Sequence, residues 1–142
     1  MTRATELSAA IRARLEQISP ENGYHTDLKA VLEFRPAKDS QPAPFALLRW
    51  VEDRTDSRRL RDALRSRDYI VRGVFSRTAT LADLERFHYD VLRSLGWGGG
   101  VFDRPLPGDV LSDSAEIEEA EDGSGHRVIT ITLEARYAEP YA

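Results

Sequence analysis

Residues 80–96 read TLADLERFHYDVLRSLG, and this stretch carries the clearest structural signal in the chain. Four apolar side chains recur at helical spacing and line one face: Leu84, Phe87, Val91 and Leu95. Such a stripe predicts an amphipathic helix that packs against another element of the fold. Thr80 is suited to cap the first turn, and Asp83 is favoured there by the helix dipole. We expect this helix to stop at Gly96.

A second amphipathic helix is predicted at the N-terminal end, over residues 5–18. Its apolar face repeats at spacings of four, four and three residues: Leu7, Ile11, Leu15 and Ile18. The segment from Ser19 to Gly23 contains Pro20 and an Asn-Gly pair, which cannot continue a helix and favour a turn.

Strand signals occupy most of the remaining chain. Period-two alternation, or runs of β-branched and aromatic residues, predicts five strands, at residues 28–35, 45–52, 68–75, 113–121 and 128–137. The apolar run of 45–52 favours a central position in the sheet. The last two strands flank Asp122-Gly123-Ser124-Gly125, which is typical of a hairpin tip. In the final strand, alternate residues share one apolar face: Ile129, Ile131, Leu133, Ala135 and Tyr137.

Residues 53–66 do not follow either pattern well. Leu60, Ala63 and Leu64 have helical spacing, but three apolar residues make a thin stripe. The segment is interpreted either as a short helix or as an arginine-rich excursion that becomes ordered only against a partner.

The element order is therefore helix, three strands, helix, hairpin. This order predicts an α+β fold of two layers, with a mostly antiparallel or mixed sheet of about five strands and two helices packed on one face.

The 142 residues fit one domain spanning 1–142. The chain has no cysteine, no apolar run of the roughly 20 residues that span a bilayer, and no secretion signal at residues 1–6. We expect a cytosolic product, or one assembled in a cytosol.

Charge is unevenly distributed along a chain whose formal net charge is −4. Residues 54–77 hold eight arginines and three aspartates, a net of +5. Residues 103–126 hold eight acids and one arginine, a net of −7. Two opposite blocks predict complementary surfaces, within the fold or between copies of it.

No pattern of residues points to catalysis, a cofactor or a metal. The glycine-rich segment 96–100 follows a helix and lacks a phosphate-binding fingerprint, so it is interpreted as a hinge. His25 with Asp27 offers at most two metal ligands, and His88 is interpreted as a histidine at the boundary of the core. The acidic run of 116–122 is typical of a solvated face. The protein is therefore expected not to be an enzyme. Binding of nucleic acid by the arginines of 54–77 stays an alternative, against which stands the acidic pI near 5.4.

Several short motifs, taken in order, carry a family resemblance. They are a helix ending at Ile18, the segment Asn22-Gly23-Tyr24-His25-Thr26-Asp27, Pro44, the strand Tyr69-Ile70-Val71-Arg72-Gly73, the helical pieces Ala82-Asp83-Leu84 and Asp90-Val91-Leu92, and a closing strand ending at Tyr137. The chain resembles the tail terminator (tail completion) and minor tail proteins of long-tailed bacteriophages over most of its length. Arg54–Arg67 and Gly96–Gly100 do not match the family pattern.

The resemblance implies a virion protein of the tail–neck region, assembled in the cytoplasm of a bacterial host. Such a subunit forms a ring, expected to be a hexamer, on the last ring of the tail tube, stops tube growth and presents a surface to the head–tail connector. Its expected partners are further copies of itself, the tail-tube protein and the connector, with DNA only passing through the lumen and no membrane or cofactor. A neck or head-closure protein of the same assembly is the alternative.

A ring requires contacts between copies, and the two charge blocks supply a candidate. We hypothesise that arginines of one copy meet acids of its neighbour, the residues being Arg58, Arg59, Arg61 and Arg65 on one side and Glu116, Glu118 and Glu119 on the other. A second use of the acids is to line a lumen that DNA crosses without sticking.

Overall fold

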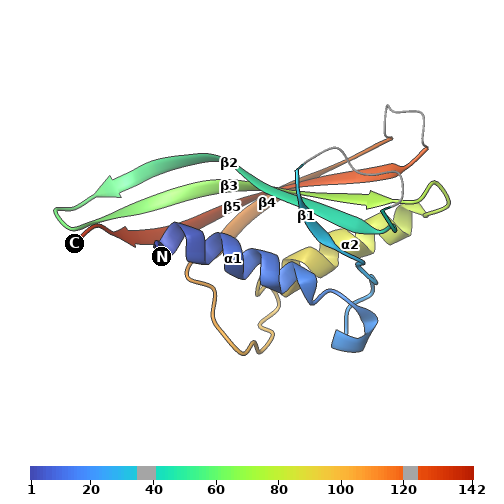
Figure 1. Ribbon diagram of the computed structural model, residues 1–142, viewed down its shortest axis with the longest axis horizontal. Helices are drawn as coiled ribbons and strands as arrows, with labels where there is room; N and C mark the ends of the chain where they lie inside the picture. The colour runs from blue at the N-terminus through green and yellow to red at the C-terminus, as the bar shows by residue number, and fades with distance from the viewer. Residues whose placement is uncertain (35–40, 120–124) are drawn as a thin grey trace.

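A five-stranded mixed sheet forms one layer of the computed structural model, and two helices form the other (Figure 1). The structure describes residues 1–34, 41–119 and 125–142. In chain order the elements are α1 (Arg3–Glu16), a 3₁₀ turn (Pro20–Asn22), β1 (Val31–Glu33), β2 (Phe45–Arg58), β3 (Asp62–Phe75), α2 (Leu81–Ser94), β4 (Asp109–Glu119) and β5 (Arg127–Pro140). The strand order is β1-β2-β3-β5-β4, and every pair is antiparallel except β1 with β2. The predicted α+β class is confirmed.

Both predicted helices are present and begin with side-chain caps. Thr2 accepts a hydrogen bond from the backbone N–H of Thr5 at the start of α1. Thr80 and Asp83 form a reciprocal capping box at the start of α2, in which each side chain accepts from the other's backbone N–H. The predicted apolar faces are buried: Leu7, Ile11, Leu15 and Ile18 near α1, and Leu84, Phe87, Val91 and Leu95 along α2.

The core lies between the helices and one face of β3 and β5. The five alternating residues predicted for the last strand are all buried there. Gly73 on β3 lets the ring of Phe87 reach the sheet, because a Cβ at this glycine would lie 2.5 Å from the ring. Phe75 packs edge-on against the same ring, with centroids 5.5 Å apart.

The structure corrects the interpretation of residues 53–66. They form neither a helix nor an isolated excursion, because β2 continues to Arg58 and β3 begins at Asp62. Register shifts between Trp50 and Glu52, and between Thr55 and Ser57, mark β-bulges in β2. Each bulge reverses the alternation of faces, so the period-two signal disappears although the strand continues.

The observed bounds of other elements differ from the predicted bounds by several residues. The strand predicted at 28–35 is only the three residues of β1, and β4 begins at Asp109, four residues before the predicted start. The predicted hairpin tip at 122–125 lies outside the described residues, apart from Gly125. In the glycine-rich segment, Gly96, Gly98 and Gly99 have positive φ values, which glycine adopts readily. Within the described residues, neither helix has the length and apolarity needed to cross a membrane.

Candidate functional site: an arm and an acidic edge

The β2–β3 hairpin extends beyond the layer of helices at the end of the molecule near the N-terminus of α1 (Figure 1). We call residues 53–67 the arm. The last residues of β5 run beside it, since Asp62 pairs with Pro140 and the N–H of Tyr141 donates to the carbonyl of Arg61 at 2.7 Å. Leu60 at the turn is 93% exposed. The arm is therefore a ribbon of strands whose tip is open to solvent.

A network of polar side chains fixes the base of the arm to the body. The carboxylate of Asp53 accepts hydrogen bonds from Nε of Arg65 at 2.6 Å, Nε of Arg67 at 2.7 Å and the hydroxyl of Tyr137 at 2.5 Å. Burial alone would raise the pKa of Asp53, but these three donors outweigh it and the pKa is lowered. Burial and the bond to Asp53 raise the pKa of Tyr137 to about 12.

Arg67 is the most enclosed cation of this network. Its guanidinium lies over the ring of Trp50, 4.4 Å from the centroid, and donates to the hydroxyl of Ser8 on α1 at 3.3 Å. Ser8 also shares a hydrogen bond of 2.7 Å with the hydroxyl of Tyr69. The network thus connects α1, β2, β3 and β5, and it sets the direction in which the arm leaves the body.

The face of the sheet opposite the helices carries ion pairs that cross the strands. Arg54 on β2 contacts Asp68 on β3 at 3.1 Å and Glu134 on β5 at 2.7 Å. Arg72 on β3 contacts Glu118 on β4 at 3.2 Å. Exposed pairs of this kind add little stability, but they neutralise the arginines locally.

The basic block of 54–77 is therefore divided among several surfaces. Arg54 and Arg72 lie in ion pairs on the open face, while Arg65 and Arg67 are held by Asp53 at the base of the arm. Of the four others, three are exposed at the tip of the arm (Arg58, Arg59 and Arg61), and Arg77 is exposed beyond the end of β3. Arg59 approaches Asp62 at 3.9 Å, at the limit of an ion pair.

At the other side of the sheet, β4 forms an acidic edge. Its eleven residues include five acids and no base: Asp109, Asp113, Glu116, Glu118 and Glu119. Asp113 pairs with Nε2 of His88 at 2.6 Å, and His88 is half-buried, as predicted for the boundary of the core. Glu116 and Glu118 are exposed. The side chain of Glu119 is outside the described part of the structure.

The hypothesised contact residues are thus not brought together within one copy. Arg58, Arg59 and Arg61 lie at the tip of the arm, whereas Glu116 and Glu118 lie on the opposite edge strand. Arg65 already has an intrachain partner in Asp53, and Glu118 has one in Arg72.

Sequence reasoning missed the Asp53 network. The sequence feature that could have indicated it is the pair Arg65 and Arg67. Two residues apart, they lie on one face of a strand, opposite Asp53. That signal depends on recognising residues 53–67 as a hairpin, which the bulges obscured.

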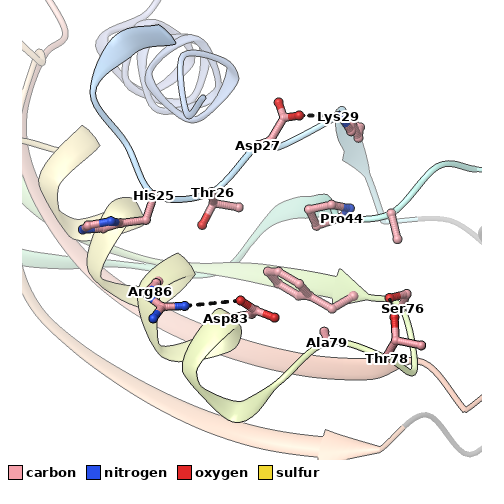
Figure 2. Close-up of a pocket in the computed structure, with 12 residues that line it drawn as sticks. His25, Thr26, Asp27, Lys29, Pro44, Ser76, Thr78, Ala79, Asp83 and Arg86 are labelled. Carbon is pink, nitrogen blue, oxygen red and sulfur yellow. Dashed lines mark hydrogen bonds and ion pairs between the residues drawn. The ribbon is translucent and has the colours of Figure 1, made fainter. Parts of the chain in front are cut away.

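A shallow pocket of about 360 Å³ lies at the other end of the sheet, beside the start of α2 (Figure 2). Its charged groups are paired with each other: Lys29 with Asp27 at 2.5 Å, and Arg86 with Asp83 at 3.4 Å. His25 lines the pocket and lies near the ring of Tyr89, with centroids 5.8 Å apart. Among the described residues, no three potential metal ligands cluster here or elsewhere. The arrangement is an open polar hollow, and the expectation that the protein is not an enzyme stays a prediction.

Comparison with solved structures supports the fold, and no comparison identifies a family. Neither the protein-family models nor the curated proteins include a match to this chain. A solved structure titled "Virion of native gene transfer agent (GTA) particle" contains a chain with the same fold, at a TM-score of 0.63 and 17% sequence identity. The alignment covers 96% of each chain. The two-layer fold of this chain therefore also occurs in a chain of a virion particle.

Proposed function

We propose that this protein is a structural subunit of a phage-like virion, and that it acts as the tail terminator. The observation that carries the proposal is the fold shared over 96% of both chains with a chain of a gene transfer agent virion. The motifs that resemble phage tail terminator proteins support the same role. They include the segment Asn22–Asp27, whose backbone is fixed by Asp90: the N–H groups of His25 and Thr26 donate to its carboxylate at 3.0 and 2.7 Å.

The physical basis of termination is the symmetry of the contacts. A tube grows because the upper face of each ring matches the lower face of the next, a heterologous contact that does not close on itself. A terminator ring reproduces one of these faces and lacks the other. Growth stops at that ring, and its free face becomes the docking surface for the head–tail connector.

The ring itself requires a contact between neighbouring copies, which we expect to number six. The exposed arginines at the arm tip and the acids of β4 are suited to it, because they lie at opposite sides of the subunit. Arg58, Arg59 and Arg61 are the exposed candidates on the basic side, with only a long contact of 3.9 Å between Arg59 and Asp62. On the acidic side, Glu116 is the candidate without an intrachain ion pair among those described. Arg65 is instead bound to Asp53 at the base of the arm.

The open face of the sheet suits a surface that DNA passes without binding. Arg54 and Arg72 are matched there by acids in cross-strand pairs, which weakens the attraction of this face for a phosphate backbone. The nucleic-acid-binding alternative is disfavoured because four arginines of the block are already bound to acids: Arg54, Arg65, Arg67 and Arg72. A neck or head-closure role differs only in its partner, which would be the connector rather than the tail tube.

Reconstitution with polymerising tail-tube protein tests the proposal. Purified chain added before polymerisation should bind tube ends and shorten the tubes seen by electron microscopy, in proportion to its concentration. A chain that binds the connector but leaves tube length unchanged would move the protein to the neck. A chain that binds neither would contradict both roles.

A further inference from the structure

Two edges of the sheet are open, and they lie on opposite sides of the subunit. β1 pairs with β2 only at Ala46–Leu48, so the outer side of residues 49–58 has no neighbouring strand within the described residues. β4 is the strand at the other edge and pairs with β5. Unpaired backbone groups along an edge are a template for another strand, and natural proteins cover or block such edges.

Charge restricts what can cover these edges. The arm contains six arginines and three aspartates, a net of +3, whereas β4 carries five acids and no base. Pairing β4 with β4 of a second copy would place like charges opposite each other, which destabilises a cross-strand pair. Pairing β4 with the arm places opposite charges together. The electrostatics therefore favour a heterologous contact over an isologous one.

Strand directions fix the orientation of this contact. β2, β3, β5 and β4 are successively antiparallel, so β2 and β4 of one copy run in opposite directions. When a second copy is placed beside the first with the same orientation, its β2 therefore meets β4 in antiparallel fashion. By register Glu52 lies level with Ser112, so the second copy is also shifted along the strands until its arm lies beside β4. Each copy then uses its arm on one side and offers its own β4 on the other.

We propose that the arm of one copy docks along β4 of a second copy, with the outer edge of β2 adding antiparallel to the outer edge of β4. The proposal rests on the assembly role proposed above, and it specifies the contact on which a ring of such subunits would depend. The bulges at Val51 and Asp56 confine regular backbone pairing to Glu52–Thr55, so side chains supply the remaining contact. Exposed apolar groups are present on both partners: Leu60 on the arm and Val51 just before it on β2, and Leu111 and Ile117 on β4.

The absence of cysteine from the chain makes disulfide trapping a clean test. Single cysteines are introduced on β2 (Glu52→Cys, Arg58→Cys) and on β4 (Ser112→Cys, Glu116→Cys), all at exposed positions. Differently tagged variants are mixed and oxidised, and covalent dimers are identified by mass. Gln17→Cys, exposed beyond the end of α1, is the control for random collision.

We expect covalent dimers when a β2 variant is mixed with a β4 variant. We expect none from β2–β2, β4–β4 or Gln17→Cys mixtures. Antiparallel docking further requires that Arg58→Cys prefer a lower-numbered β4 partner than Glu52→Cys does. Dimers dominated by β4–β4 links, the reverse order of preference, or oligomers that form without any β2–β4 link would each overturn the proposal. So would a chain that stays monomeric and forms no mixed link. The tube-length assay judges the terminator role independently of these results.

Discussion

Nε of Arg67 on β3 donates to the carboxylate of Asp53 on β2 at 2.7 Å, and both side chains are only 10% exposed. The same carboxylate accepts from Arg65 and from Tyr137 on β5. One acid thus satisfies donors from two other strands at the point where the arm leaves the body. The geometry of any assembly that uses the arm depends on this acid.

Replacing the acid should destabilise the fold. Asp53→Asn leaves Arg67 enclosed without its anionic partner. We expect the free energy of unfolding to fall by about 2–3 kcal/mol. This is less than the cost of breaking a fully buried ion pair, because the network is near the edge of the core. Urea unfolding followed by circular dichroism measures the change. Asp62→Asn is the matched control, because Asp62 faces Arg59 on the exposed tip at 3.9 Å, and it should barely move the midpoint. Equal effects of the two substitutions would contradict the assigned role.

The contribution of Asp53 should depend on pH. Its pKa in the folded state is lowered relative to the unfolded value of about 3.9. A lowered pKa stabilises the fold above the unfolded pKa, and this stabilisation is lost as pH falls through the folded pKa. The difference in unfolding free energy between the wild type and Asp53→Asn should therefore be constant near neutral pH and shrink below about pH 4. A difference that grows on acidification would contradict this sign.

The contribution of Tyr137 to stability should also depend on pH, but it should be lost at high pH. Its pKa is raised to about 12, by burial and by the hydrogen bond to Asp53. The stabilisation is fully present below the unfolded pKa of about 10 and is lost as pH rises through the folded value. Ultraviolet titration of the wild type should show a tyrosinate transition near pH 12 that is missing in Tyr137→Phe. Identical titration curves for the two proteins would show that the phenol is not held in this network.

The body of the fold could be predicted from sequence because its signals are local. The stripe of Leu84, Phe87, Val91 and Leu95 and the cap at Thr80 define α2 without reference to any other element. The strand at 128–137 is equally clear, since its alternation continues unbroken. Each of these patterns is set by contact with one common core.

The arm could not be predicted in the same way. Ala63 is the only apolar residue of the arm that is buried, so little apolar periodicity is required of these residues, and the bulges of β2 shift what alternation remains. The partners of Asp53 are 12, 14 and 84 residues away along the chain. Such contacts appear only once the register of β2, β3 and β5 is known.

Gly73 should tolerate no side chain while Phe87 is present. A Cβ at residue 73 would lie 2.5 Å from the Phe87 ring and 3.1 Å from Ile129, so Gly73→Ala should cost about 1–3 kcal/mol through overpacking. Thermal unfolding of Gly73→Ala, Phe87→Leu and the double variant forms a cycle. We expect the double variant to be more stable than the sum of the single losses predicts, because the smaller side chain makes room for the methyl group. Stability losses that simply add in the double variant would contradict the close approach of residue 73 to the Phe87 ring.

The arm tip should matter for assembly and not for folding. Reversal of its three exposed arginines to glutamate (Arg58→Glu, Arg59→Glu and Arg61→Glu together) should leave the unfolding midpoint unchanged and abolish ring formation, measured by light scattering after size separation. Arg65→Glu is the contrasting variant, because Arg65 is bound to Asp53 at 2.6 Å and its reversal should lower the midpoint. Rings of wild-type size from the triple variant would contradict pairing of the tip with a neighbouring copy.

The role proposed for this protein is to end the tail tube. The most direct test is the distribution of tail lengths, by electron microscopy, in particles produced without this chain. The account predicts overlong tails without heads beside filled heads, with normal length restored when the chain is supplied in trans. Tails of normal length that are still joined to heads would contradict it.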